Sequence, residues 1–429
     1  MATNTAAQLD ALFIQYHEKV IAPQFPQATP FLNQLKEAGP EWQVNAKGWK
    51  SNAYLRQEAS NLWGLPGFSF PAGGTTVDKN YYVYRAKYGK SYVVDGSTYN
   101  DLRRGNDSTM LSESANMNRL MMNAAQELEQ AAMGDGLGRK AIISSASTTV
   151  LTLLTTPNGL NASGFGADEL IETGVYDILT SSGSLANPSQ QAVTFPEGGI
   201  NRINNTVTLS SAITAPAANS IIVYTGSYNM YPAGIRYLID GARTGYFQGI
   251  DASTEPYLNS SKIDASSADI SVNLVQNLMT KHIFRNGGQK KMRLKAFAAP
   301  TQIALYTQGG WNLVRYDSDK KDFNLGFDTA SYGGINFQSL VSMDPDVFVI
   351  ADLADFRKLV GKKLGPHQED GLLWRQSSGS NSVGSDNWYI NYGFEGNYAI
   401  TEPRKHGIIT NLSVTGMATQ ASLYSTSAS

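Results

Sequence analysis

Residues 109–138 read TMLSESANMNRLMMNAAQELEQAAMGDGLG, the clearest helical pattern in the chain. Apolar side chains recur at three- and four-residue steps, which places them on one face of a helix. Ser112 can cap this helix, Glu113 supplies an acid to its first turn, and Gly134 can end it. The pattern therefore predicts a helix over residues 112–133, about 33 Å long at 1.5 Å per residue. The apolar face consists of Met117, Leu120, Met121, Ala124, Leu128 and Ala132.

Upstream of this helix, residues 61–105 are rich in aromatic residues and glycine. The run YYVYRAKYGKSYVV at residues 81–94 alternates with a period of two, which predicts a long strand. The flanking glycines predict that this strand belongs to a two-stranded excursion from the body. Because an isolated β-hairpin is only marginally stable in water, we expect it to lie on another surface.

The N-terminal residues 8–38 carry a weak helical pattern that Pro23, Pro26 and Pro30 interrupt before FLNQLKEAG resumes it. Prolines at this spacing cannot all lie inside one helix. The segment is therefore predicted to be an extended arm with short helical pieces.

Downstream of the helix, residues 141–230 change composition abruptly. Only six of these 90 residues are charged, and short runs rich in Thr, Val and Ile are separated by Gly, Pro and Asn. This pattern predicts short strands in a small sandwich or barrel, inserted as a self-contained β unit.

The remaining chain mixes helical and strand patterns. Residues 266–288 predict an amphipathic helix that Gly287 and Gly288 end, and Pro300 opens a further helix that Gly309 and Gly310 end. The segments MRLKAFAA, VFVIADL, DNWYINYGF and HGIITNLSV predict strands, and ADFRKLVG at residues 354–361 predicts a short helix. The chain as a whole is therefore predicted to be α+β.

Composition restricts the chemistry. The chain has no cysteine, which excludes disulfides, thiolate metal sites and a cysteine nucleophile. Only 16% of residues are charged and the formal net charge is −2, which argues against nucleic-acid binding by bulk electrostatics and suits a surface buried against neighbours. The N-terminus lacks the pattern of a signal peptide and no run reaches transmembrane length, so we expect a protein made in a cytoplasm.

No motif predicts a catalytic or metal site. GDGLGRK follows a helix, so a helix end and turn explains its glycines better than a phosphate loop does. The four histidines are isolated. Four acids could serve a hydrolase, although turns and helix caps are their default use: Asp344, Asp346, Asp352 and Asp355. The densest basic cluster favours a protein contact, because no aromatic residues alternate with its charges: Lys281, Arg285, Lys290, Lys291, Arg293 and Lys295.

Taken in order, these segments resemble the major capsid proteins of tailed bacteriophages, which have the HK97-like fold. The matching stretches are residues 61–105, residues 112–133 and the phrases YPAGIRYLIDGARTGYFQGID, HIFRNGG and AAPTQIALY. The resemblance implies an N-terminal arm (1–60), an extended β-hairpin loop (61–108), the spine helix of a peripheral domain (109–140), an all-β insertion domain (141–230), and an axial domain with the remainder of the peripheral domain (231–429).

The resemblance implies a structural protein that self-assembles into hexamers and pentamers and closes an icosahedral shell around phage double-stranded DNA. It implies no enzymatic activity and no cofactor or metal, a place in the virion capsid after assembly in the host cytoplasm, and weak non-specific contact with DNA. Portal, separate scaffold and decoration proteins are the implied partners. Implied subunit contacts are Tyr82, Tyr84, Lys87, Tyr88 and Lys90 on the loop and Phe13, Tyr16 and Phe25 on the arm, with Met117, Met121 and Leu128 packing the spine helix.

Two alternatives stay open. A cellular encapsulin-type nanocompartment shell protein shares the fold, although we expect such a chain to be shorter and to lack a β insertion of this size. A carbohydrate-active hydrolase or binding protein would fit the tyrosine and tryptophan content, but it needs a cleft with convergent acids.

Overall fold

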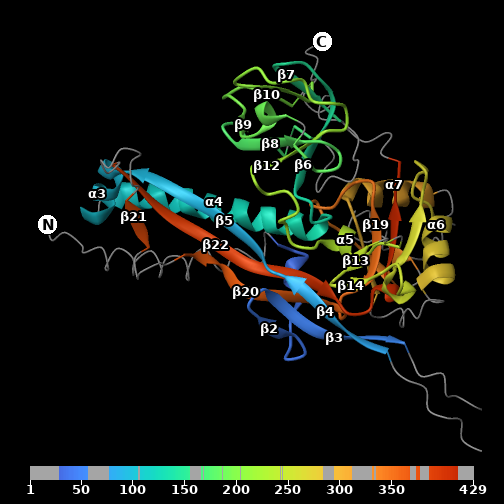
Figure 1. Ribbon diagram of the computed structural model, residues 1–429. Coiled ribbons are helices and arrows are strands. Elements are labelled where there is room, and N and C mark those ends of the chain that lie inside the picture. The colour runs from blue at the N-terminus through green and yellow to red at the C-terminus, as the bar shows by residue number, and fades with distance from the viewer. Residues whose placement is uncertain are drawn as a thin grey trace, which may run out of the picture.

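The computed structural model describes residues 29–413 except 57–76, 105–106, 155–165, 168, 186, 203, 242, 244, 284–293, 312–330, 333–334, 368–372 and 377–385. Their helices and strands form an α+β structure, as the sequence predicts. Figure 1 shows one long helix, α4, with a ribbon of long strands beside it, an all-β unit above it and a second sheet with helices at its end. The arm residues 1–28 lie outside the described residues.

Helix α4 (Asp107–Met133) begins five residues before the predicted start, so Ser112 lies inside it. Met117 and Met121 are buried against Leu102 of helix α3 (Gly96–Arg104) and Trp374, whereas Leu128 belongs to the central core. The chain turns after α4 through Gly136 and Gly138, which adopt the left-handed φ of 84° and 74° that glycine tolerates. The turn that follows the helix agrees with the sequence interpretation of GDGLGRK.

The β-hairpin consists of strands β3 (Gly48–Arg56) and β4 (Val77–Tyr84), with β2 (Gln43–Asn45) at the edge. Along β4, Tyr81 and Val83 are buried while Tyr82 and Tyr84 are exposed, so the predicted period of two is present. The predicted bounds of the loop, 61–108, differ from this hairpin. Its first strand lies in the segment assigned to the arm, because alternation marks a strand without identifying its partner.

At Arg85 the chain leaves the hairpin sheet, and strand β5 (Ala86–Asp95) pairs along its whole length with β22 (Asn387–Ile400). Residues 81–94 are therefore two strands in two sheets. Strand β22 also pairs with β20 (Phe356–Pro366) and β21 (Trp374–Gln376), and β1 (Lys36–Glu37) pairs in parallel with β20 at the edge of the sheet. The short helix predicted over residues 354–361 is wrong, because this segment pairs with β22 and buries Phe356 and Leu359 in the central core.

The all-β unit is one antiparallel seven-stranded sheet in the order β10-β11-β7-β6-β12-β8-β9. It encloses its own core around Tyr176 and Phe195, whose rings stack at 4.7 Å. The first strand, β6, and the last, β12, are neighbours in the sheet. The strands are β6 (Arg139–Ala146), β7 (Val150–Leu153), β8 (Val175–Leu179), β9 (Val193–Thr194), β10 (Ile200–Asn201), β11 (Thr206–Thr208) and β12 (Ile221–Tyr224), with the turn η4 (Pro188–Gln190) between β8 and β9.

The second sheet is mixed and six-stranded, in the order β15-β23-β19-β16-β18-β17. The helix predicted over residues 266–288 is split into α6 (Val272–Asn277) and a π-helical turn, η6 (Leu278–Ile283), while α7 (Pro300–Trp311) continues through Gly309 and Gly310. The strands are β15 (Ser261–Asp264), β16 (Leu294–Ala298), β17 (Ser331–Tyr332), β18 (Ile335–Ser339), β19 (Phe348–Asp352) and β23 (Gly407–Thr410).

Short elements join these parts. The N-terminal cap of α5, Gly234, lies so close to the end of α4 that a Cβ there would meet the carbonyl oxygen of Gly134 at 2.3 Å. The short elements are η3 (Leu32–Gln34), α5 (Ile235–Leu238), β13 (Tyr246–Phe247), β14 (Ile250–Asp251), η5 (Pro256–Leu258) and η9 (Pro403–Lys405).

Candidate interaction surfaces

Strand β5 presents two different faces. Lys87, Gly89, Ser91 and Val93 point outward and are exposed, whereas the alternate residues face helix α4. On that inner face the hydroxyl of Tyr88 donates to Glu127 of α4 and the hydroxyl of Tyr92 donates to Glu113. The ribbon, which is the sheet formed by β5, β22 and β20, is therefore attached to α4 by hydrogen bonds and leaves its other face uncovered.

The residues predicted for the extended loop divide between these environments. Tyr82 and Tyr84 on β4 are 42% and 70% exposed, and Lys87 reaches solvent while pairing with Glu395 at 3.3 Å. Tyr88 and Lys90 are partly buried on the side that faces α4. Three of the five residues thus lie on an open surface, whereas Tyr88 bonds to Glu127 within the subunit and Lys90 lies partly buried beside it.

Met117, Met121 and Leu128 are fully buried on α4. Phe13, Tyr16 and Phe25 lie outside the described residues. Of the basic cluster, Lys295 is described with its side chain, and its Nζ donates to Gln34 Oε1 at 2.7 Å.

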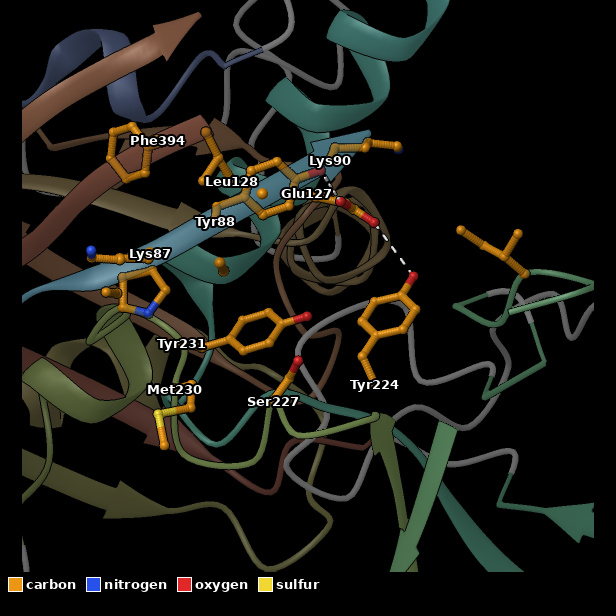
Figure 2. A pocket seen from close by; sticks show the side chains of 15 residues that line it. Lys87, Tyr88, Lys90, Glu127, Leu128, Tyr224, Ser227, Met230, Tyr231 and Phe394 are labelled. Carbon is orange, nitrogen blue, oxygen red and sulfur yellow. Dashed lines mark hydrogen bonds between the residues drawn. The ribbon is translucent and has the colours of Figure 1, made fainter. Parts of the chain in front are cut away.

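A cavity of about 370 Å³ lies where β5, α4 and the segment after β12 meet (Figure 2). Glu127 projects into it from α4 and accepts hydrogen bonds from Tyr88 of the ribbon and, at 3.4 Å, from Tyr224 of β12. Burial raises the pKa of Tyr88 and of Tyr224, so both phenols stay protonated and remain donors. One carboxylate therefore ties three separate parts of the fold together.

A buried lysine strengthens the same junction from the side of the all-β unit. Lys140 of β6 is only 4% exposed and pairs with Glu169 at 3.7 Å. Its Nζ lies 5.4 Å from the centroid of the Tyr224 ring and 5.9 Å from that of Tyr231, which are cation–π distances. The sequence pattern did not identify Lys140, Glu169, Tyr224 or Tyr231 as a cluster, because the two tyrosines lie at the end of the insertion that is farther from α4 in the sequence.

The carboxylates proposed for a hydrolase serve the fold. Arg236 of α5 binds Asp344 at 2.6 Å and Asp346 at 3.2 Å, and all three side chains lie largely inside the protein. Burial raises the pKa of Asp344 well above its usual range, against the opposing effect of Arg236. Asp352 Oδ1 accepts from the backbone of Ala354, which is the turn role expected by default.

Asp355, the fourth acid, lies 3.9 Å from Nε2 of His406, which is completely buried. Burial, followed by the nearby Lys405 charge, lowers the pKa of His406 to about 3, so the imidazole is neutral. Its Nδ1 accepts a hydrogen bond from the backbone of Asp352 at 3.1 Å. This histidine is a packed core residue.

No group of three or more His, Asp or Glu side chains among the described residues could hold a metal ion. Likewise, no helix within the described ranges is both long and apolar enough to cross a membrane.

Another contact holds the segment around Phe31 against α4. The backbone N–H groups of Phe31 and Leu32 donate to Glu129 of α4 at 2.7 and 3.1 Å, so a helix side chain caps η3. The helical continuation predicted for FLNQLKEAG amounts to η3 alone, followed by β1. Burial raises the pKa of Glu129 to about 7, against the lowering effect of the two N–H groups.

Comparison with known proteins gives matches among solved structures. The chain is similar to the capsid of cyanophage A-1(L), with a TM-score of 0.48, 10% identity, and coverage of 90% of this chain and 93% of that one. The capsid of a native GTA particle matches with a TM-score of 0.46, 8% identity and 90% coverage of each chain. An encapsulin from Synechococcus elongatus matches with a TM-score of 0.39, 10% identity, and coverage of 97% and 93%. No family model and no curated protein matches.

Proposed function

We propose that this chain is the major capsid protein of a tailed phage with an HK97-like fold, a structural subunit that assembles into hexamers and pentamers of an icosahedral shell around double-stranded DNA. The observation that carries the proposal is the hairpin and ribbon: long strands that lie along α4, with one face uncovered (Figure 1). Such a surface is stabilised when neighbouring copies bury it.

Exposed aromatic residues next to the hairpin support this reading. Tyr82, Tyr84 and Tyr246 border a groove of about 520 Å³ between β4 and the β13–β14 turn, and the last two are among the most exposed large side chains of the described residues. Tyrosine is enriched at the centres of protein interfaces, because its ring supplies contact area at little cost in conformational entropy. Aromatic anchors of this kind dominate interface energies.

Helix α4 supplies the rigidity that a shell subunit needs. Its 27 residues span about 40 Å, and the hairpin, the ribbon and the all-β unit all attach to the body around it. We infer that portal, separate scaffold and decoration proteins bind such shells, and that the packaged DNA meets the inner face through sparse contacts, in line with the net charge of −2.

Assembly is the direct test. The protein is expressed alone and together with a scaffold protein encoded beside it, and the products are sized by chromatography and imaged by negative stain. Closed shells or capsomer rings are expected, and a monomer of 46.5 kDa under both conditions would contradict the proposal. Nuclease-protected DNA inside particles from phage-producing cells separates a genome container from a nanocompartment.

The hairpin surface can be tested by substitution. Replacing both Tyr82 and Tyr84 with serine is expected to reduce the yield of shells at least tenfold, because two exposed aromatic anchors are lost while the subunit core is untouched. The matched control is Tyr257→Ser on η5, since Tyr257 is 44% exposed, close to the exposure of Tyr82. Equal shell yields from the double variant and the control would show that the hairpin surface is not an interface.

A further inference from the structure

The uncovered face of the ribbon carries three glycines in register, one from each of three adjacent strands. Gly393 of β22 lies opposite Gly89 of β5 on one side and opposite Gly365 of β20 on the other. A Cβ built at Gly89 would meet no atom within 4 Å, and one at Gly393 would meet only a carbonyl oxygen at 3.6 Å. The fold of the subunit therefore does not require glycine at these two positions.

Glycine is a poor choice for the interior of a strand. It loses more backbone entropy on folding than other residues and offers no side chain to neighbouring strands. A strand glycine often marks a β-bulge or a place where a ligand or another backbone approaches closely. The pairing of β20 with β22 shifts register between Lys362 and Gly365, whereas β5 pairs with β22 without a shift at Gly89. Two open glycines side by side, with a third in line, make a flat floor for such an approach.

Polar side chains border this floor on both sides. Lys87, Glu395 and Lys362 lie in register along one edge, where Lys87 pairs with Glu395 at 3.3 Å. On the other edge Ser91 donates to Asn391 at 2.7 Å, and the backbone N–H of His367 donates to the carbonyl of Asn391. Together they enclose a groove of about 360 Å³, the glycine groove.

The charge of the glycine groove is positive. Three lysines line the groove, Lys87, Lys90 and Lys362, against one acid, Glu395, which pairs with Lys87. The Nζ of Lys362 contacts the imidazole of His367, and neither Lys90 nor Lys362 pairs with a carboxylate of the described residues. An occupant with an acidic side chain would therefore complement the groove. This chain offers such a group on its own surface, since Glu197 lies exposed in a turn of the all-β unit and forms no ion pair with the described residues.

We propose that the glycine groove is a contact between copies of this chain, in which an exposed segment of a second copy, carrying an acid such as Glu197, lies across Gly89 and Gly393 and places a carboxylate near Lys362. The inference rests on the proposed shell function and identifies one of its interfaces. Nucleic acid is the less suitable occupant, because the aromatic residues that line the groove, Tyr88, Tyr392 and Phe394, are buried or partly buried and offer no exposed face for a base.

The test is Gly89→Val. Valine is favoured in strands and its Cβ has open space here, so the thermal midpoint of the unassembled subunit is expected to stay unchanged or rise. The yield of shells is expected to fall at least tenfold, because the side chain fills the floor. Gly361→Val on the adjacent strand β20 is the matched control, since a Cβ at Gly361 meets no atom closer than 3.6 Å and Gly361 does not line the groove.

A second measurement keeps the proposal testable if Gly89→Val lowers subunit stability. Hydroxyl-radical footprinting of the wild-type protein is expected to show protection of residues 87–93 and 387–395 in shells relative to unassembled subunits. Equal labelling in both states, or full shell yield from a stable Gly89→Val subunit, overturns the groove contact while leaving the shell function intact. A wild-type chain that never assembles contradicts the shell function itself.

The charge is tested separately with Lys362→Glu. Shell assembly is expected to weaken at least fivefold, and binding of a short double-stranded DNA to the unassembled subunit is expected to stay the same. The opposite result, weaker DNA binding with normal assembly, would assign the groove to nucleic acid and overturn the proposal.

Discussion

Replacing Arg236 with methionine is expected to lower the free energy of unfolding of the unassembled subunit by about 3–5 kcal/mol. Arg236 is the shared counterion of Asp344 and Asp346, whose side chains are almost completely buried. Without it, two carboxylates would remain side by side in a medium that solvates neither, and burial already raises the pKa of Asp344. Urea denaturation at neutral pH measures the loss.

An exposed ion pair provides the control for this experiment. Lys262 pairs with Asp240 at 3.2 Å, but both side chains are more than a third exposed, so Lys262→Met is expected to cost less than about 1 kcal/mol. Adding Asp344→Asn to Arg236→Met should recover part of the lost stability, because it removes one of the stranded charges. Equal and small effects of Arg236→Met and Lys262→Met would show that the buried cluster contributes little.

The stability of the subunit is expected to fall as pH rises from about 4.5 to about 7, and Glu129→Gln is expected to abolish this part of the dependence. The pKa of Glu129 is about 7 in the folded chain, against an ordinary 4.5, because burial outweighs the two N–H groups that bind it. Its contribution is fully present below about 4.5 and is lost as pH passes through about 7. The difference corresponds to about 3 kcal/mol.

Urea unfolding of wild type and Glu129→Gln at several pH values between 4.5 and 8 measures this effect. The wild-type protein should lose about 3 kcal/mol more than the variant across this range. Glu197→Gln serves as the control because its carboxylate lies on the surface, and it should keep the wild-type slope. Parallel curves for wild type and Glu129→Gln would mean that Glu129 ionises in the folded chain much as it does in the unfolded one.

The parts of the fold that sequence could predict depend on local pattern. The apolar stripe of α4 identified Met117, Met121 and Leu128 as packing residues of a helix, and the alternation at Tyr82 and Tyr84 identified a strand with one exposed face. A three-residue period and a two-residue period follow directly from helix and strand geometry. Even there, alternation continued through Arg85 and concealed the point where the chain changes sheets.

Pairing over long distances is what sequence could not supply. Ser91 and Asn391 are neighbours across two strands although 300 residues separate them. The segment FRKLVG became part of β20 because its partner, β22, lies next to it in space. Glu127 could not be identified for the same reason: its two phenol donors are distant in sequence, one on β5 and one at the far end of the all-β unit. A single carboxylate on a polar helix edge carries no signal of such partners.

Because β6 and β12 lie side by side, the all-β unit leaves the body and returns to it at nearly one point, where the backbone N–H of Asn229 bonds to the carbonyl of Leu137 at 3.1 Å. The two ends of the all-β unit therefore lie as close together as the two ends of a tight turn. An unrelated domain whose termini lie close together could be grafted between Leu137 and Asn229 with little added closure entropy. If copies of this chain form a shell, a domain inserted at that position is displayed once in every subunit.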